Sequence, residues 1–179
     1  MALIIKNRAV AEDAWQVVRA AEDGALPAAA ALPAGKVLVP LALWQAERDA
    51  LVAGRSRDAL GVWLAPDSEP ADLVADFDRI ALIGVDFPRF ADGRGYSIAR
   101  LLRERHGWTG ELRALGDVLR DQLLYMSRCG FDAFAVRADK DIHDALHAFG
   151  EFSQRYQGAV DNPSPLFRRR DGAVQKVGA

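Results

Sequence analysis

The stretch that decides the fold is Ile80-Ala-Leu-Ile-Gly-Val-Asp-Phe87. It is short, largely apolar and followed at once by Pro88, and a buried parallel strand has this continuous apolar pattern rather than an alternating one. Similar short runs lie on both sides of it, with helical segments between them. The other strand candidates are Lys36–Val39, Gly61–Leu64, Glu111–Leu115 and Asp132–Val136.

The segments between these strands have helical periodicity, and several end in glycine. Gly54, Gly107 and Gly130 each follow a periodic segment, where glycine most easily adopts the left-handed conformation that ends a helix. In the last helix apolar residues recur at helical spacing as far as Tyr156, so this helix should cover the sheet. The expected helices are Leu41–Ala53, Ala71–Phe77, Tyr96–His106, Asp117–Cys129 and Lys140–Tyr156.

Alternating strands and helices are typical of βα units around a mainly parallel sheet, so the sequence predicts an α/β fold. A doubly wound sheet and a partial (βα) barrel both give this alternation, and both remain open. We expect one domain over residues 1–160, with an irregular segment over residues 1–35 that contains a strand candidate at Leu3–Lys6. Residues 161–179, with the triplet Arg168-Arg-Arg170, should form a flexible tail.

Composition excludes several classes of function. The formal charge is -2 and the charges are interspersed, so no global field would draw the protein onto nucleic acid or an anionic membrane. Cys129 is the only cysteine, which excludes an intramolecular disulfide or a cysteine-ligated cluster within one chain; a buried structural thiol is expected. No apolar run is long enough for a signal segment or a membrane span, and we expect the protein in the cytoplasm.

Polar and glycine residues gather in the loop that follows the central strand candidate. Ligands of α/β sheets bind at the carboxyl ends of the strands, and glycines followed by a helix start suit an oxyanion such as phosphate, sulfate or sulfite. The alternative is a tight turn at Asp92-Gly93, with Asp92 or Ser97 capping the helix and solvated arginines around it. The loop lacks the third glycine of a dinucleotide fingerprint, and it separates Ser97 from the strand end, unlike a nucleophile elbow. The candidate anion- or partner-binding residues are Arg89, Asp92, Gly93, Arg94, Gly95, Tyr96 and Ser97.

A second strand-end loop, Gly116-Asp117, begins the next predicted helix. Asp117 and Asp121 should lie on one face of that helix, where paired carboxylates can act as acid and base. They can equally cap the helix and pair with Arg113 or Arg120. The sequence therefore gives Asp117 and Asp121 as catalytic candidates and Arg113 as a lining residue.

No metal site is predicted. His143 and His147 have a spacing that can bind one metal ion, but they lie opposite the apolar stripe of their helix, and no third ligand is near in sequence. We therefore expect both histidines to be solvated polar side chains on the surface of the helix.

The distinctive part of the chain resembles a bacterial family of uncharacterised proteins that are described as probable oxidoreductases involved in sulfite reduction and are typically encoded beside assimilatory sulfite reductase. The segments that carry the resemblance are Phe87-Pro-Arg-Phe-Ala-Asp-Gly-Arg-Gly-Tyr-Ser97, Ala99–Arg103, Gly110–Ala114, Gly116–Gln122, Arg128–Ala133, Tyr156-Gln157 and Pro165–Arg168.

The resemblance implies a role in sulfur assimilation, whereas the residues show no paired cysteines, nucleotide fingerprint or metal cluster that would carry redox chemistry. We therefore expect an accessory protein that binds sulfite or the sulfite reductase, with no cofactor in this chain and with siroheme and an iron-sulfur cluster on the partner. Whether the chain is itself an enzyme stays open. The alternatives are an independent small-molecule enzyme of partial-barrel type, with an aspartate base and a glycine-rich anion loop, and a pure protein-interaction module.

Overall fold

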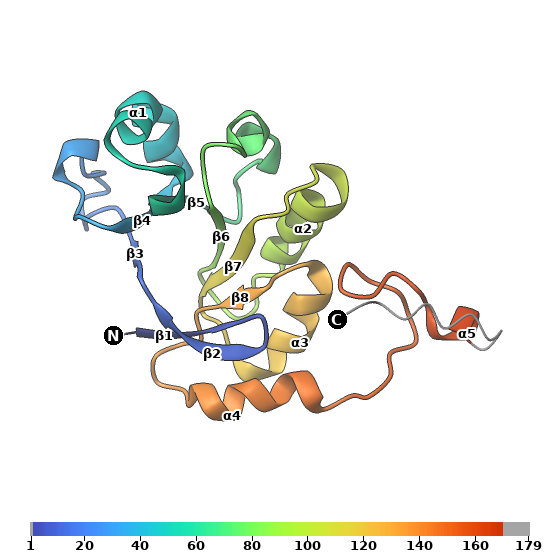
Figure 1. Ribbon diagram of the computed structural model, residues 1–179. Coiled ribbons are helices and arrows are strands. Elements are labelled where there is room, and N and C mark those ends of the chain that lie inside the picture. Colours follow the sequence, from blue (N-terminus) through green and yellow to red (C-terminus); the bar gives the residue numbers. More distant parts are fainter. Residues whose placement is uncertain (1, 170–179) are drawn as a thin grey trace.

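The computed structural model describes residues 2–169 and shows an α/β protein built on one curled, eight-stranded sheet (Figure 1). The strand order is β2-β1-β8-β7-β6-β5-β4-β3, and the sheet has the form of a half-barrel that is mostly parallel. The strands are β1 (Ala2–Lys6), β2 (Ala9–Asp13), β3 (Trp15–Val17), β4 (Lys36–Pro40), β5 (Leu60–Leu64), β6 (Leu82–Phe87), β7 (Glu111–Gly116) and β8 (Ala133–Phe134).

The central strand predicted from the sequence is β6, and all six of its residues are buried. It pairs in parallel with β5 on one side and β7 on the other. From β3 to β8 the parallel strands follow one another in chain order without a reversal. A doubly wound sheet reverses direction at a switch point, so this order is that of a barrel segment.

The antiparallel part of the sheet comes from the N-terminus. β1 and β2 form a hairpin whose turn places Asn7 and Arg8 at φ of 49° and 63°, and β1 pairs with β8. β2 and β3 are the two edge strands, yet only Ala14 separates them in the chain. At this corner Asp13 Oδ1 accepts a hydrogen bond of 3.0 Å from the Trp15 amide. The chain thus passes directly from one edge of the curled sheet to the other.

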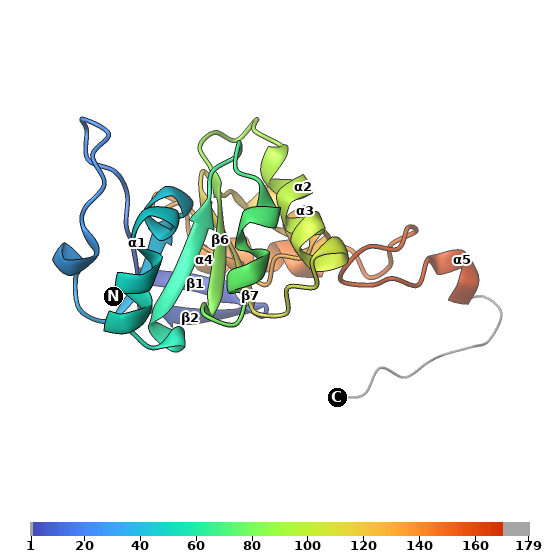
Figure 2. The same cartoon turned by 90° about the horizontal axis from the view of Figure 1, so that it is seen from above.

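All the α-helices except the last cover the outer face of the sheet, where the main hydrophobic core lies (Figure 2). Trp44 of α1, Leu123 of α3 and Phe149 pack in this core with strand residues such as Val85 and Ala114. The helices are α1 (Leu41–Gly54), α2 (Arg94–Arg100), α3 (Arg120–Cys129), α4 (Ile142–Leu146) and α5 (Leu166–Arg169); α2 continues as a π-helical turn (Leu101–Arg105), and 3-10 turns occur at Ala29–Ala31, Arg57–Ala59, Pro70–Asp76 and His147–Gly150.

A second, smaller apolar cluster fills the inner face of the half-barrel. Leu38, Leu82 and Leu115 are buried there, and Trp15 and Trp63 pack against them. The strands approach closely because two of their inward positions are glycine, Gly61 and Gly84. The inner face is therefore a packed layer of side chains, as in complete barrels of this kind.

We predict that Gly84→Ala lowers the free energy of unfolding by about 1–3 kcal/mol, because the added methyl group overpacks the inner layer. A Cβ at this position would lie 2.7 Å from Leu115 Cδ1 and 3.0 Å from Trp63 Cβ. Urea unfolding followed by tryptophan fluorescence measures the change. Gly54→Ala is the matched control, since a Cβ there meets nothing within 4 Å; equal effects of the two substitutions would contradict the prediction.

The predicted strands are confirmed to within about two residues at each end, but two helices differ from the prediction. The helix predicted to begin at Asp117 begins at Arg120, so Asp117 is not its N-cap. The helix predicted to reach Tyr156 ends as a 3-10 turn at Gly150. As a result Phe152 and Tyr156, which the periodicity assigns to the core face, are among the most exposed large apolar side chains.

The N-terminal 35 residues are more ordered than the sequence predicts. The strand expected at Leu3–Lys6 is confirmed as β1, and β2 and β3 add two strands to a segment expected to be irregular. Between β3 and β4 the chain forms a loop with one short 3-10 turn, at Ala29–Ala31. Of the predicted C-terminal tail, Leu166–Arg169 forms the short helix α5, and residues 170–179 lie outside the described residues.

Candidate functional site

Strands β3 to β8 form one continuous parallel run, so their carboxyl ends lie along the same edge of the half-barrel. We call the charged and aromatic side chains at this edge the rim. This is the edge at which α/β sheets and barrels place their ligand sites. The rim consists of Arg19, Asp86, Phe90, Asp92, Arg94, Asp117, Arg137 and Asp139.

Asp86 is the acidic member of the rim that is most enclosed. It is 7% exposed and belongs to the carboxyl end of β6. Its Oδ1 atom accepts a hydrogen bond of 2.7 Å from Arg19, whose guanidinium lies 5.1 Å from the centre of the Trp63 ring. A Cβ on Gly116 would lie 3.0 Å from the same oxygen, so the glycine leaves room for the carboxylate. The arrangement is a partly desolvated ion pair stacked on an aromatic ring.

The loop after β6 contains its own anion, the side chain of Asp92. Arg94 donates hydrogen bonds to this carboxylate from Nε at 3.0 Å and from Nη2 at 2.7 Å, and the Arg94 amide donates a third at 3.2 Å. The Arg94 side chain lowers the pKa of Asp92 from its usual value. The amide groups of Asp92 and Tyr96 donate to carbonyl groups within the same segment. An external oxyanion at Arg94 would therefore have to displace Asp92.

The two glycines of this loop have different surroundings. A Cβ on Gly95 would lie 2.6 Å from the Phe87 ring, so this glycine allows α2 to pack on β6 rather than bringing a backbone amide to a ligand. Gly93 has a φ of -86°, and a Cβ there meets only the Tyr96 ring, at 3.9 Å. Tyr96 packs edge-on against Phe87, and burial raises the pKa of its hydroxyl group.

The remaining predicted residues of the loop point to solvent. Ser97 lies on the exposed side of α2, beside Arg100, and Arg89 is exposed next to Phe90. Phe90 is 47% exposed, although its backbone makes two hydrogen bonds. Its amide donates one of 2.9 Å to Asp117 Oδ2, and its carbonyl accepts one of 3.3 Å from the Gln122 side chain. The structure thus fixes the backbone of Phe90 and leaves its ring at the surface.

Asp117 binds across the rim instead of capping α3. Its Oδ1 atom accepts 2.7 Å from Arg137, which follows β8, while Asp139 accepts 2.6 Å from the same guanidinium. The hydrogen bonds from Arg137 and Lys140 lower the pKa of Asp139 to about 2. The pKa of Arg137 is raised, mainly by its hydrogen bond to Asp139 and secondly by its hydrogen bond to Asp117. These contacts tie the loops after β6, β7 and β8 together.

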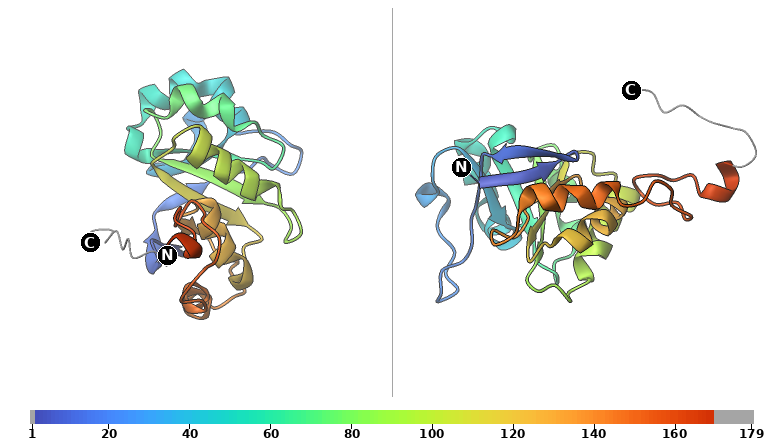
Figure 3. Two further views of the ribbon diagram at one scale, coloured as in Figure 1. Left: turned by 90° about the vertical axis from the view of Figure 1, so that its right-hand side faces the viewer. Right: turned by 90° about the horizontal axis from the view of Figure 1, so that it is seen from below.

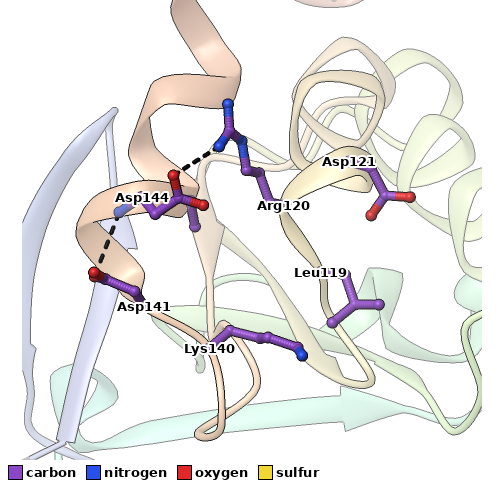
Figure 4. A pocket seen from close by; sticks show the side chains of 7 residues that line it. Leu119, Arg120, Asp121, Lys140, Asp141 and Asp144 are labelled. Atoms are coloured by element: carbon purple, nitrogen blue, oxygen red, sulfur yellow. Dashed lines mark hydrogen bonds and ion pairs between the residues drawn. The ribbon is translucent and has the colours of Figure 1, made fainter.

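Asp121 lies in the first turn of α3, whereas Asp117 lies in the loop before this helix, so the two carboxylates do not form the predicted pair. Asp121 is exposed and lines a cavity of about 320 Å³ between the first turns of α3 and α4 (Figure 4). In the same cavity Arg120 donates 2.7 Å to Asp144 and Asp141 caps α4, while Asp121 has no ion pair with any residue in the described range. Only Asp117 belongs to the rim.

Arg113 does not line the loop after β6. It is 1% exposed on the inner face of β7, where it pairs with Asp13 at 2.8 Å and with Glu111 at 2.6 Å. It lies four residues before Asp117, roughly 13 Å along a strand. Its surroundings are those of a structural ion pair.

Other titratable residues have structural environments. Cys129 is buried, as predicted, and burial raises the pKa of its thiol. His143 and His147 are exposed on α4 and the following turn. Within residues 2–169 no group of three or more histidine, cysteine, aspartate or glutamate side chains could hold a metal ion. In the same range no helix is both long enough and apolar enough to cross a membrane.

Sequence reasoning missed five members of the rim, namely Arg19, Asp86, Phe90, Arg137 and Asp139. Asp86 had a recognisable signal, since it is the only charged residue in the apolar run of β6 and comes at its carboxyl end. Arg19 lies 67 residues from Asp86 in the chain, and Arg137 lies 20 from Asp117. No local pattern marks these two arginines.

The fold and rim define a half-barrel α/β protein whose strand-end loops are cross-linked by arginine–aspartate pairs. The model of a protein family described as "Bacterial protein of unknown function (DUF934)" matches residues 61–167, and the chain belongs to this family. The match extends from β5 to the start of α5, and so includes the rim residues from Asp86 onward. No curated protein and no solved structure matches the chain.

Proposed function

We propose that this protein is an accessory factor of assimilatory sulfite reduction that binds the sulfite reductase through the rim. The resemblance of Phe87–Ser97 and the later segments to proteins encoded beside that enzyme supports the pathway. Siroheme and the iron-sulfur cluster would then reside on the partner, and the complex would act in the cytoplasm.

The observation that favours docking over capture of a free oxyanion is the pairing of the rim arginines. Arg19, Arg94 and Arg137 each contact an aspartate at 2.7 Å or less. A guanidinium that already binds a carboxylate offers little attraction for sulfite, because the anion must replace an existing charge-assisted bond. A protein surface can instead add contacts around a network that is already fixed.

Phe90 is the expected anchor of this interface. Its ring projects from a backbone held on both sides, by Asp117 and by Gln122. Aromatic side chains and arginine are enriched at protein interfaces, and a rigid backbone lowers the entropy lost on binding. The Phe90 ring, with Arg89 beside it, would enter an apolar pocket on the reductase.

The test is purification of the tagged full chain from sulfate-grown cells, with siroheme in the eluate measured by its absorbance. Wild-type protein should retain siroheme, and Phe90→Ala should reduce it by about tenfold or more, the loss typical of a hot-spot residue. Val74→Ala, which alters an exposed apolar residue of the 3-10 turn at Pro70–Asp76, is the control. Absence of siroheme from the wild-type eluate would reject the proposal.

Calorimetric titration with sulfite and sulfate separates docking from oxyanion capture. We expect no heat from the wild-type protein, because Asp92 occupies Arg94. Binding that disappears in Arg94→Gln would mean that the rim is an oxyanion site after all, and would remove the argument for docking.

A second candidate, an independent small-molecule enzyme, is favoured by Asp86. Its enclosed carboxylate at the carboxyl end of a central strand has the position of catalytic groups in (βα) barrels. Asp86 would then replace Asp117 and Asp121 as the acid–base residue. Turnover of a phosphate- or sulfate-bearing compound by the purified protein, lost in Asp86→Asn, would select this function.

A further inference from the structure

A second surface, away from the rim, combines exposed aromatic rings with arginines. It lies where α3 meets the segment that follows the turn at His147–Gly150 (Figure 3). Tyr125, Arg128, Phe152, Arg155 and Tyr156 line a groove of about 430 Å³ there. We call this groove and the residues that line it the aromatic–arginine face.

The aromatic rings of this face are unusually open to solvent. Tyr125, Phe152 and Tyr156 are 58%, 61% and 66% exposed, the highest values among the large apolar residues in residues 2–169. Single exposed apolar side chains are common on protein surfaces, but rings grouped around one groove mark interaction sites. Tyrosine and arginine are also the residue types enriched in binding hot spots.

The face is held in place before any partner binds. The Tyr125 ring packs edge-on against Tyr96 with centroids 5.1 Å apart. Arg128 anchors the following segment, since its side chain donates 2.9 Å to the Gln157 carbonyl and its own carbonyl accepts 3.1 Å from the Val160 amide. A preformed groove loses less conformational entropy on binding than a flexible one.

The charges of the face are one-sided. The groove is lined by Arg128 and Arg155 and by no acidic side chain. Arg155 is neutralised by Asp161 at 2.7 Å, whereas Arg128 has no carboxylate within 4.0 Å among the described residues and keeps its full charge. The guanidinium of Arg128 therefore gives the groove a positive charge that attracts carboxylates.

We propose that the aromatic–arginine face binds an acidic segment of a protein partner. A carboxylate of that segment would pair with Arg128, in the geometry that guanidinium and carboxylate groups favour, and a neighbouring aliphatic or aromatic side chain would enter the groove between the exposed rings. The proposal does not depend on the sulfite reductase, because the surface is distinct from the rim and its recognition chemistry is different.

The probe is an array of twelve-residue peptides that carry two carboxylates around one leucine or phenylalanine at varied spacings, with a matching array in which asparagine and glutamine replace the acids. The full-length protein should bind several acidic members with Kd below about 100 µM and bind their amide counterparts at least about tenfold more weakly. Affinity should fall as salt increases, since the contact is partly electrostatic. Equal binding to both arrays, or no binding to either, would overturn the proposal.

Variants of the full chain locate the binding. Arg128→Gln and Phe152→Ala should each weaken binding by about tenfold, while Arg128→Lys, which keeps the charge, should recover part of it. Arg57→Gln, which removes an exposed arginine that has no ion pair in residues 2–169, is the charge-matched control and should bind as wild type does. Binding unchanged in Arg128→Gln would place the acidic segment elsewhere.

Vesicles of phosphatidylcholine and phosphatidylglycerol test the other macromolecule that such a surface could contact. We expect no co-flotation with them. Co-flotation that is lost in Phe152→Ala would assign the face to an anionic membrane and reject a protein segment as its occupant.

Discussion

Arg113→Met is expected to lower the free energy of unfolding by about 3–5 kcal/mol, because it removes one partner from a buried ion-pair network. The guanidinium lies between the carboxylates of Asp13 and Glu111, which are each 10% exposed. Without Arg113 both carboxylates would lose this partner where water hardly reaches. Lys6 contacts Glu111 at 2.7 Å, but it reaches Asp13 through no ion pair in the described chain and cannot replace Arg113.

Urea unfolding measures this loss, and the combined variant Asp13→Asn/Glu111→Gln/Arg113→Met identifies its cause. Since a neutral network leaves no buried charge unpaired, the combined variant should be more stable than Arg113→Met alone. A loss below about 1 kcal/mol for the single variant, together with impaired partner binding, would restore Arg113 to the functional role expected from the sequence.

Arg103→Met should destabilise the protein by about 3 kcal/mol or more, for a different set of contacts. Arg103 lies in the turn after α2 and donates to three carbonyl groups, those of Gly130, Trp108 and Gly110, at 2.7–2.9 Å. It also donates 2.8 Å to Asp132, whose other oxygen accepts from the Leu112 amide. One side chain thus joins α2, the start of β7 and the α3–β8 loop.

The loss in Arg103→Met should depend on pH in a defined direction. Burial raises the pKa of Asp132 even beside Arg103, so protonation of this carboxyl group favours the folded state. A raised folded-state pKa contributes stability that is present at low pH and is lost as pH rises through that pKa. Removing Arg103 raises the pKa further, so the deficit relative to wild type should shrink as pH falls from about 7 toward 4.

Unfolding of both proteins at several pH values checks this direction. Arg57→Met is the control, because Arg57 is exposed and outside this network. A deficit that is constant across the range would mean that the three lost carbonyl contacts, rather than the charge left on Asp132, account for the effect.

The parallel strands could be predicted from sequence because burial on both faces imposes continuous apolar runs, as in β6. The helix ends at Gly107 and Gly130 could be predicted for a local reason, since their φ values of 70° and 110° favour glycine. The β2 strand could not, because Ala9–Asp13 alternates weakly and pairs along only one edge. Helical spacing alone also placed Phe152 on a core face, although the helix has already ended at Gly150.

The position of the candidate residues at the strand ends could be predicted from the sequence, but the partners of their side chains could not. The strand-end position of the loop after β6 follows from chain order, and Asp117 is indeed near it. What sequence could not show is that Asp92 satisfies Arg94 within two residues, or that Arg113 finds its partner Asp13 100 residues away. Pairings of this kind depend on how the sheet curls, and no spacing rule contains that information.

The direct passage from β2 to β3 through Ala14 also constrains the order in which the protein can form during synthesis. β3 can pair with β4 once Lys36 is available, but β1 must wait for β8, where Ile5 pairs with Phe134. β1 is therefore among the last strands of the sheet to be paired on both sides. A nascent chain that stops short of β8 leaves the hairpin with an open backbone edge, and unpaired edges of this kind recruit other strands. The nascent chain should reach a stable fold only after residue 134 has emerged from the ribosome.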